Sequence, residues 1–442
     1  MNILILGSGI VGANLAKKLS EQGKNVYLID DNTDDLNTLS EKFDIKTISA
    51  DPLDPQFYKN FKNDINYFIA VTKSDEKNIL TCKFAKDYLG VDKTIARIRN
   101  QNLINEASDI EFKASNEFLD YVISPEKEVS SNIFEKIHMP GAFFSEKLMA
   151  NQLSLVGLKS SDLFKNHSYE EIKNFFNTNN IIYVGHSIEE DISLDFHGIK
   201  DSDHLYIILK LNSIQPLIKF FGFVDDALNI LIIGGGTIGY NLAKLIENDD
   251  QKINLKILET SPSRCEFLVK ELNDTNIFNG NALDQSLYEE MELSKMDLVI
   301  SVTDNDQINI ILSIIAKKRG SDSVISIINN ETFSSFANDL GIDIFINPRE
   351  LTTSRIIEKI SQGNLLSYHS ILRESHTIYE VKYHNDLFEI IKDNKIYNHI
   401  CTFSEEKLHL STSEHLPTTN DILFISLENK YSAKFEKILD DY

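Results

Sequence analysis

The residues best suited to chemistry are three glycines near the N-terminus and an acidic residue that follows them. Gly7, Gly9 and Gly12 form a G-x-G-x-x-G pattern directly after a short apolar run. In a strand-to-helix turn, the first glycine allows the tight turn, the second opens the backbone to a pyrophosphate, and the third lets the helix pack closely. Asp30, eighteen residues after Gly12, stands where a carboxylate accepts both ribose hydroxyls. The pattern predicts a site for NAD(H) or an adenine nucleotide.

The same pattern occurs again about 227 residues later. Residues 2–17, NILILGSGIVGANLAK, match residues 229–244, NILIIGGGTIGYNLAK. Glu259 takes the place of Asp30 at the end of the next apolar run. Further matches follow in the same order and indicate a duplication: Asp54 with Asp284, Thr72 with Thr303, Asp75 with Asp306, and Asn78 with Asn309.

Several other residues have both a binding and a structural interpretation. Asp51, after the third apolar run, could hydrogen-bond an adenine edge or form an Asx turn. Thr72 and Asp75 follow the fourth run, where ligands bind in open α/β sheets, but Ser74 or Asp75 could instead cap the next helix. The residues alone leave these alternatives open.

Two arginines distinguish the first copy from the second. Arg97 and Arg99 stand at the end of the fifth predicted strand, and we expect one to point towards the phosphates and the other to be buried or solvated. The second copy has Ile327 and Asn329 instead. The loss of this cationic clamp predicts a weaker or different nucleotide preference in the second half, although drift after duplication would give the same pattern.

The elements that position these residues follow from short apolar runs that alternate with amphipathic stretches. In the first copy we expect strands at 3–6, 26–29, 46–48, 67–71 and 94–98, and helices at 11–21, 34–42, 75–89 and 101–108. Right-handed crossovers then give an α/β fold, a Rossmann-type doubly wound parallel sheet. The second copy repeats it from Ile230 to about Ile346.

Each sheet is followed by a helix-like segment, at 125–137 and 348–360, and then by shorter alternating strands such as 204–209 and 422–427. We interpret these regions as bridging helices that lead to small α+β modules. The predicted domains are two Rossmann domains at 1–124 and 223–347, each followed by a bridging helix and a small module, at 125–222 and 348–442.

The composition limits the possible partners. A formal net charge of -23 over 442 residues argues against nucleic acid and anionic lipid. Cys82, Cys265 and Cys401 are isolated, which favours reduced thiols in a cytosolic protein. The apolar segment 217–236 is interrupted by charges such as Lys219, so we expect no direct membrane insertion. Neither export signals nor metal-ligand spacings are expected.

The sequence contains no recognisable catalytic motif. Eleven histidines occur without H-E-x-x-H, and no serine has a nucleophile-elbow context. Neighbouring carboxylates such as Glu189, Glu190 and Asp191 are typical of a solvated face. We therefore expect no catalytic residue and no enzyme activity.

Several segments in order resemble the TrkA family of potassium uptake regulators, which are built from tandem RCK (KTN) units. The resemblance spans the chain and rests on residues 2–12, 68–78, 94–100 and 121–126, which read NILILGSGIVG, FIAVTKSDEKN, TIARIRN and YVISPE. It implies that the small modules are TrkA-C (RCK-C) domains, whose characteristic turn corresponds to residues 198–205.

The resemblance also implies a function and a set of ligand contacts. It implies a homo-oligomeric, tetrameric ring on a Trk-type potassium channel subunit, at the cytosolic face of the inner membrane, gated by NAD(H), ATP or ADP. The contacts carried over by motif match are Gly7, Ser8, Gly9, Ile10, Val11, Gly12, Asp30, Asp51, Thr72 and Arg97 in the first half. In the second half they are Gly234, Gly236, Thr237, Ile238, Gly239, Glu259 and Asn281.

Two departures from the family pattern bear on these expectations. The first copy reads Ala50-Asp51-Pro52 where the family has Gly-Asp-Ala, which stiffens the loop at the expected adenine contact. The second small module reads LPTTND at 416–421, without the usual glycine before the aspartate. The competing functions are a nicotinamide-dependent oxidoreductase with duplicated cofactor domains and a structural scaffold that binds no nucleotide.

Overall fold

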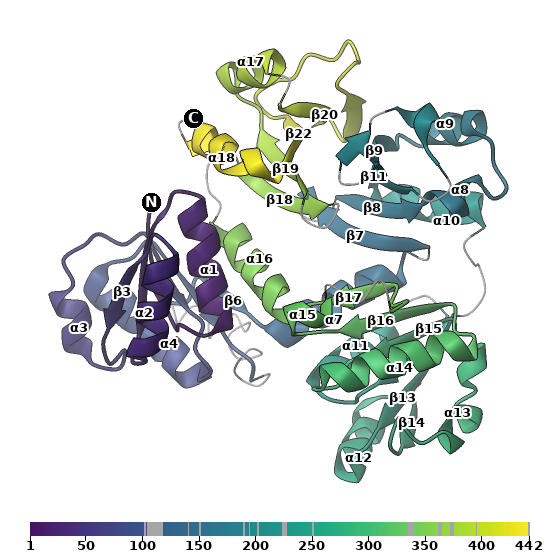
Figure 1. Cartoon of the computed structure of the whole chain (residues 1–442), viewed down its shortest axis with the longest axis horizontal. Helices are drawn as coiled ribbons and strands as arrows, with labels where there is room; N and C mark the ends of the chain where they lie inside the picture. The colour runs from purple at the N-terminus through teal and green to yellow at the C-terminus, as the bar shows by residue number, and fades with distance from the viewer. Residues whose placement is uncertain are drawn as a thin grey trace. The chain divides into compact units, whose positions relative to one another are not determined.

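The computed structural model (Figure 1) describes the chain except for residues 101–102, 104–117, 140, 150–151, 189–190, 194, 201–202, 223–227, 250–251, 335–339, 361–364, 372–374, 395 and 441–442. Apart from Leu103, the helix expected at 101–108 lies outside the described residues. Two compact units are formed: unit 1 comprises residues 1–129 and 347–361, and unit 2 comprises residues 130–346 and 362–442. The division into four domains stays a prediction.

Unit 1 contains a sheet of six parallel strands in the order β3-β2-β1-β4-β5-β6. The strands are β1 (Asn2–Leu6), β2 (Asn25–Asp30), β3 (Lys46–Ser49), β4 (Tyr67–Ala70), β5 (Lys93–Arg97) and β6 (Tyr121–Ile123). All residues of β4 and all but the first of β1 are buried, as expected for a sheet covered on both faces. The predicted Rossmann-type fold is confirmed for this half.

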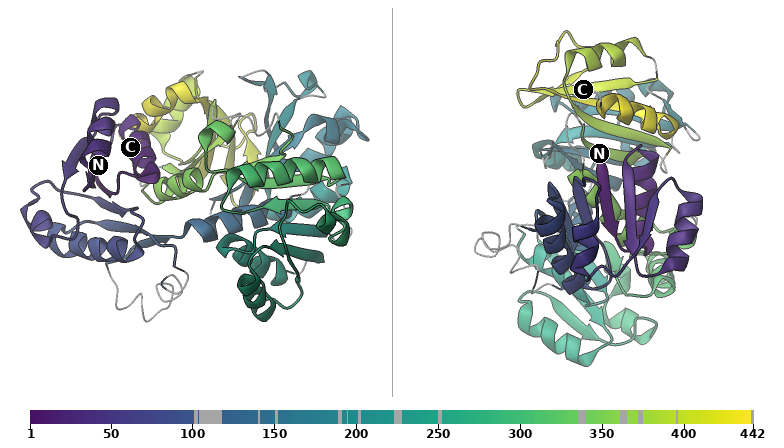
Figure 2. Two further views of the ribbon diagram at one scale, coloured as in Figure 1. Left: turned by 60° about the horizontal axis from the view of Figure 1, so that its bottom comes forward. Right: turned by 90° about the vertical axis from the view of Figure 1, so that its left-hand side faces the viewer.

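Helices cover both faces of this sheet (Figure 2). They include α1 (Ile10–Glu21), α2 (Thr33–Lys42), α3 (Pro55–Asn60) and α4 (Asp75–Phe84), which continues as a π-helical turn at Ala85–Leu89. Side chains of Asn32, Asp54 and Ser74 cap α2, α3 and α4 by accepting backbone N–H groups of the first turn. These caps fix where each helix begins after the loop that follows the preceding strand.

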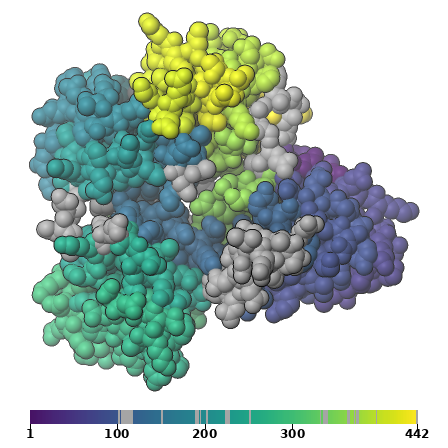
Figure 3. Space-filling view, turned by 180° about the vertical axis from the view of Figure 1, so that it is seen from behind, coloured from purple at the N-terminus to yellow at the C-terminus, as the bar shows by residue number. Residues whose placement is uncertain are grey.

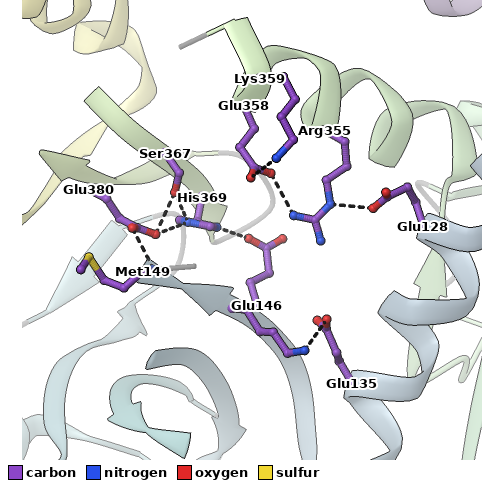
Figure 4. Close-up of polar contacts among 11 residues, drawn as sticks. Glu128, Glu135, Glu146, Met149, Arg355, Glu358, Lys359, Ser367, His369 and Glu380 are labelled. Atoms are coloured by element: carbon purple, nitrogen blue, oxygen red, sulfur yellow. Dashed lines mark hydrogen bonds and ion pairs between the residues drawn. The ribbon is translucent and has the colours of Figure 1, made fainter. Parts of the chain in front are cut away.

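Unit 1 also takes a helix from the second half of the chain. This helix, α16 (Pro348–Ile360), packs against α1 and β6. Arg355 of α16 donates to Glu128 Oε2 at 3.0 Å and to Glu358 Oε2 at 2.9 Å (Figure 4). Glu128 belongs to α7 (Pro125–Ile137), so the two helices predicted as bridges form an ion pair with each other.

Unit 2 contains the second parallel sheet, in the order β14-β13-β12-β15-β16-β17. Its strands are β12 (Leu228–Ile233), β13 (Ile253–Glu259), β14 (Asn276–Asn279), β15 (Leu298–Ser301), β16 (Ser323–Ile327) and β17 (Ile344–Ile346). Its helices are α11 (Thr237–Glu247), α12 (Pro262–Glu271), α13 (Ser286–Glu290), α14 (Asp306–Arg319) and α15 (Glu331–Ser334), with a 3-10 turn at Leu293–Lys295. Ser130 Oγ of α7 donates to Ile238 O of α11 at 3.0 Å, so the C-terminal part of α7 contacts this helix.

Two small α+β modules complete unit 2, as predicted, and their sheets are antiparallel. The first has sheet order β10-β9-β11-β8-β7 and comprises β7 (Ala142–Leu148), β8 (Leu153–Lys159), α8 (Ser160–Phe164), α9 (Tyr169–Thr178), β9 (Ile182–Ile188), β10 (Asp191–Ser193), β11 (His204–Lys210) and α10 (Ile214–Phe221), with 3-10 turns at Phe196–Gly198 and Leu211–Ser213. The second has order β18-β19-β22-β20-β21 and comprises β18 (Leu365–Ile371), β19 (His376–Lys382), α17 (Asn385–Asp393), β20 (Asn398–Ser404), β21 (Lys407–Leu410), β22 (Ile422–Glu428) and α18 (Ser432–Asp440), with a 3-10 turn at Asn429–Tyr431.

The two modules share one apolar cluster, and each has a further core of its own. Leu155 and Tyr206 of the first sheet and Phe403 and Phe424 of the second belong to the same cluster of buried side chains. In Figure 3 the blue-to-teal and the yellow-green modules accordingly lie side by side. Within the described part of the chain, none of the helices combines the length and apolar character needed to cross a membrane.

Candidate nucleotide-binding sites

The glycine loop of the first half joins β1 to α1 in a conformation that needs glycine at two positions. Gly7 has φ +111°, a value that side chains disfavour. A Cβ on Gly12 would lie 1.8 Å from Gly7 O, so a side chain there would push α1 away from the loop. By contrast, a Cβ on Gly9 would have no atom within 4 Å. Gly9 therefore leaves open space where a ligand can approach the backbone and the first turn of α1.

The loop of the second half has the same geometry between β12 and α11. Gly234 has φ +110°, and a Cβ on Gly239 would lie 2.0 Å from Gly234 O. Gly236 again has no atom within 4 Å of the added Cβ. Thr237 and Ile238 form the first turn of α11, as Ile10 and Val11 form that of α1. The structure thus contains two equivalent strand–loop–helix turns.

The acidic residue at the end of the second strand contacts each loop directly. Asp30 Oδ2 accepts a hydrogen bond from Ser8 N at 2.5 Å, and Oδ1 accepts one from Asn32 N at 3.0 Å. Partial burial opposes ionisation of Asp30, but the hydrogen bonds from Ser8 and Asn32 outweigh it and lower the pKa. Glu259 Oε2 accepts from Gly235 N at 2.8 Å in the second half. Each carboxylate therefore lies beside the loop that would bind a phosphate.

Residues after the third strand form Asx turns. Asp51 Oδ1 accepts from Leu53 N at 2.9 Å, and Asn281 Oδ1 accepts from Leu283 N at 3.0 Å. Both side chains are exposed. The structural interpretation of Asp51 is therefore present in this structure, whereas the adenine contact stays a prediction.

A buried asparagine, which the sequence showed only as a repeat match, fixes the end of the fourth strand. Asn78 is fully buried, and its Oδ1 accepts from Thr72 N at 3.0 Å and Thr72 Oγ1 at 2.7 Å. Its Nδ2 donates to Thr72 O at 3.2 Å and to Arg97 O at 2.8 Å. Asn309 makes the same contacts with Thr303 and Ile327. The asparagine joins two strand ends, and its recurrence in both copies was the only available signal.

Asp75 does not cap the helix that it begins. Ser74 caps α4 by accepting from Lys77 N, while Asp75 Oδ2 accepts from Arg99 N at 3.0 Å and Asn100 N at 2.7 Å. Asp75 thus holds the backbone that follows β5. The cap predicted as an alternative for this loop belongs to Ser74.

The two arginines of the first half differ in burial. Arg97 is 8% exposed, and its Nε is buried without a hydrogen-bond partner. Burial, together with the charge of Arg99, lowers the pKa of Arg97 to about 10 despite the opposing charges of Glu126 and Asp75. Arg99 is half exposed, and its Nε lies 3.8 Å from Glu126 Oε1. Arg97 remains a cation at neutral pH, at the carboxyl end of β5.

The second loop has a cationic contact that no sequence pattern indicates. Arg264 of α12 donates from Nε to Gly235 O at 2.6 Å and from Nη2 to Gly236 O at 3.1 Å. Its guanidinium also lies 4.3 Å from the ring centre of Phe267. Asp35 occupies the equivalent position after β2. Among the described residues, no group of His, Cys, Asp or Glu side chains is arranged to hold a metal ion.

Comparison with known proteins agrees with the duplicated geometry. The TrkA-N domain family matches residues 3–125 and 230–348, more than half of the chain. The Trk system potassium uptake protein TrkA of Vibrio alginolyticus is 28% identical, over 87% of this chain and 85% of its own length. The TrkA homolog 2 of Methanosarcina mazei is 30% identical, over 82% of this chain and 81% of its own.

Solved structures share the fold at low sequence identity. The GsuK channel has a TM-score of 0.62 and 15% identity, and the match covers 100% of this chain and 79% of the channel chain. A structure described as the GsuK channel bound to NAD has a TM-score of 0.61 and 14% identity, with coverage of 100% and 79%. The chain therefore belongs to the TrkA family and carries a TrkA-N domain in each of its two halves.

Proposed function

We propose that the chain is a cytosolic, nucleotide-binding regulatory subunit of a Trk-type potassium uptake system. The observation that carries the proposal is the pair of glycine loops, each held by an acidic residue at the end of the second strand, Asp30 in one half and Glu259 in the other. The names of the relatives support a role in potassium uptake. The NAD-bound structure of a channel with the same fold supports a nucleotide as the ligand.

The proposed ligand is NAD(H), or ATP or ADP, bound along the carboxyl ends of the strands. Phosphates would lie on the open backbone at Gly9 or Gly236, at the N-termini of α1 and α11. The ribose hydroxyls would donate to Asp30 or Glu259. The remaining proposed contacts are Gly7, Ser8, Ile10, Val11, Gly12, Asp51, Thr72 and Arg97 in the first half, and Gly234, Thr237, Ile238, Gly239 and Asn281 in the second.

The nucleotide acts as an allosteric ligand in this proposal. Thr72, Asp75 and Asn78, the polar side chains beside the expected ligand, are engaged in hydrogen bonds that shape the backbone. They are suited to positioning strand ends rather than to proton transfer. Such a ligand can shift the channel between two states of the assembly only to the extent that it binds one state more tightly than the other. The assembly is proposed to be a tetrameric ring on the channel subunit, at the cytosolic face of the inner membrane.

Calorimetric titration of the full chain with NADH, NAD, ATP and ADP tests this function. We expect binding to weaken at least about tenfold in the first half on Asp30→Ala, because the ribose contact and the loop anchor are lost together. Asp34→Ala, which removes an exposed carboxylate of the same helix-start region, is the matched control. Thermal unfolding without ligand confirms that each variant is folded.

The titration also distinguishes the competing functions. Consumption of NADH with a metabolite at an ordinary turnover would establish an oxidoreductase and overturn the proposal. Failure of every nucleotide to bind the folded chain would favour the scaffold. Binding that leaves potassium flux through the reconstituted channel unchanged would also overturn the regulatory role.

A further inference from the structure

The ends of β4 and β5 can be compared residue by residue with those of β15 and β16. Asn78 Nδ2 donates to Arg97 O at 2.8 Å, and Asn309 Nδ2 donates to Ile327 O at 3.0 Å. The same amides also hold the residues after the fourth strands, Thr72 and Thr303. These matched hydrogen bonds fix which side chains occupy equivalent places in the two sites.

The equivalent places carry different charges. Lys73 in the first half corresponds to Asp304 in the second, and both side chains are exposed. Lys77, whose Nζ lies 4.0 Å from Asp31 Oδ2, corresponds to Ile308. Arg97 corresponds to Ile327. At these three positions the carboxyl edge of β4 and β5 carries cations in the first half, while the equivalent residues of the second half are apolar or anionic.

Arg97 is the buried member of this cationic edge. Because its Nε has no hydrogen-bond partner and the side chain is 92% buried, the guanidinium lacks part of the stabilisation that a buried cation needs. Burial and the charge of Arg99 lower the pKa of Arg97, and Arg349, the second residue of α16, lowers it further. The charges of Glu126 and Asp75 raise this pKa but do not compensate for the lowering. An anion bound at this edge would relieve both effects.

Positive charge lies on the other side of the site in the second half. Arg264 contacts the loop carbonyls beside Glu259, whereas the first half has Asp31, Asp34 and Asp35 after Asp30. In a doubly wound sheet the adenosine part of a ligand lies over the first three strands, and the rest of the ligand extends over the fourth and fifth. The first half thus presents cations to the distal part of the ligand, and the second half does not.

We propose that the two halves select different nucleotides. The first half takes a nucleoside polyphosphate of the ATP class, whose terminal phosphates reach Lys73 and Arg97. The second half takes NAD(H), whose distal riboside carries no terminal phosphate and so needs no cation at the positions of Ile308 and Ile327. The proposal rests on the nucleotide-binding function above and assigns a ligand class to each half.

Charge exchange at two exposed positions tests the assignment with little risk to folding. Lys73→Asp in a Glu259→Ala background probes the first half, and Asp304→Lys in an Asp30→Ala background probes the second. ATP and NADH, both without magnesium, are titrated into each full-length variant by calorimetry. Lys17→Asp, an exposed change of the same charge in the middle of α1, is the matched control.

We expect ATP to bind more tightly than NADH in the Glu259→Ala background, and the reverse in the Asp30→Ala background. Lys73→Asp should weaken ATP binding about three- to tenfold and change NADH binding less than about twofold, and Asp304→Lys should strengthen ATP binding by a similar factor. Equal preference of the two backgrounds, or equal effects of Lys73→Asp and Lys17→Asp, would overturn the assignment while leaving nucleotide binding intact. A wild-type chain that binds neither ligand would instead overturn the proposed function as well.

Discussion

The backbone N–H of Ser8 donates to Asp30 Oδ2 at 2.5 Å, so the residue that ends β2 also fixes the loop that leads into α1. Gly235 and Glu259 have the same relationship in the second half, at 2.8 Å. The carboxylate that would bind a ribose and the loop that would bind a phosphate are therefore one connected element. A change in the charge of the carboxylate is expected to affect both.

Asp30→Asn is expected to destabilise the chain by about 1 kcal/mol at neutral pH, because the amide keeps only one of the two oxygens that accept from Ser8 N and Asn32 N, and the group is only partly buried. Burial opposes ionisation of Asp30, yet the hydrogen bonds from Ser8 and Asn32 lower its pKa below 3.8. Such a carboxyl contributes stability above its unfolded pKa and loses it as the pH falls through the folded pKa. Urea midpoints of variant and wild type should thus differ at pH 7 and converge below about pH 4. An undiminished difference at pH 3 would contradict this.

The second and third glycines of the pattern should separate binding from folding. Gly9→Ala places a Cβ in open space at φ −62°, so the variant should fold with an unfolding midpoint near that of the wild type and bind nucleotide at least about fivefold more weakly. Gly12→Ala places the Cβ 1.8 Å from Gly7 O and should destabilise the chain by several kcal/mol, about 3 or more. Circular dichroism melts and titration of NADH or ATP measure both. Equal stability of the two variants would show that the close approach is not required.

Much of the parallel architecture could be predicted from the sequence because its strands are continuous apolar runs with a glycine turn between strand and helix. The strand predicted at 26–29 is observed at Asn25–Asp30, and the helices predicted at 125–137 and 348–360 have the observed bounds. In the first parallel sheet domain, the elements that were not predicted are short. Helix α3 has six residues and β6 has three, too few for a period to be distinguished.

The missed contacts depend on partners that are distant in the sequence. The sequence predicts a helix at 348–360, but nothing in its residues says that α1 covers that helix. Arg264 contacts backbone carbonyls, which every sequence contains, so no residue pattern indicates the pair. The glycines were recognisable because their requirement is local, since Gly7 needs its φ of +111° whatever surrounds it.

Asn78→Ala should be among the most destabilising single changes near the first site. It leaves Thr72 N and the carbonyls of Thr72 and Arg97 without the amide that joins them, and each buried group that loses its partner costs about 1–3 kcal/mol. We expect a total loss of about 2–4 kcal/mol, read from the urea midpoint. Asn309→Ala should have a similar effect, since its contacts are equivalent. The control is Asn37→Ala on the exposed face of α2, and a loss no larger than that of the control would contradict the prediction.

His369 should make the stability of unit 2 depend on pH in the alkaline range. Its Nδ1 lies 2.5 Å from Glu146 Oε2 and its Nε2 lies 2.8 Å from Glu380 Oε1, where the two small modules meet (Figure 4). Burial favours the neutral ring, but the two carboxylates outweigh it and raise the pKa to about 10 from 6.5. A cation with a raised folded pKa contributes its full stability below the unfolded pKa and loses it as the pH rises through the folded one.

His369→Gln is therefore expected to lower stability by about 3 kcal/mol at pH 6, because it leaves the buried charge of Glu380 without its cation. The difference from wild type should shrink steadily as the pH rises from 6.5 towards about 10, since the wild type loses its imidazolium over this range. Urea unfolding monitored at pH 6, 8 and 10 measures it, with the exposed His197→Gln as control. Because the variant has no imidazolium to lose, its own free energy of unfolding should change less than that of the wild type between pH 6 and pH 10. A difference that stays constant from pH 6 to pH 10 would mean that His369 is neutral in the folded chain and that the junction depends on packing alone.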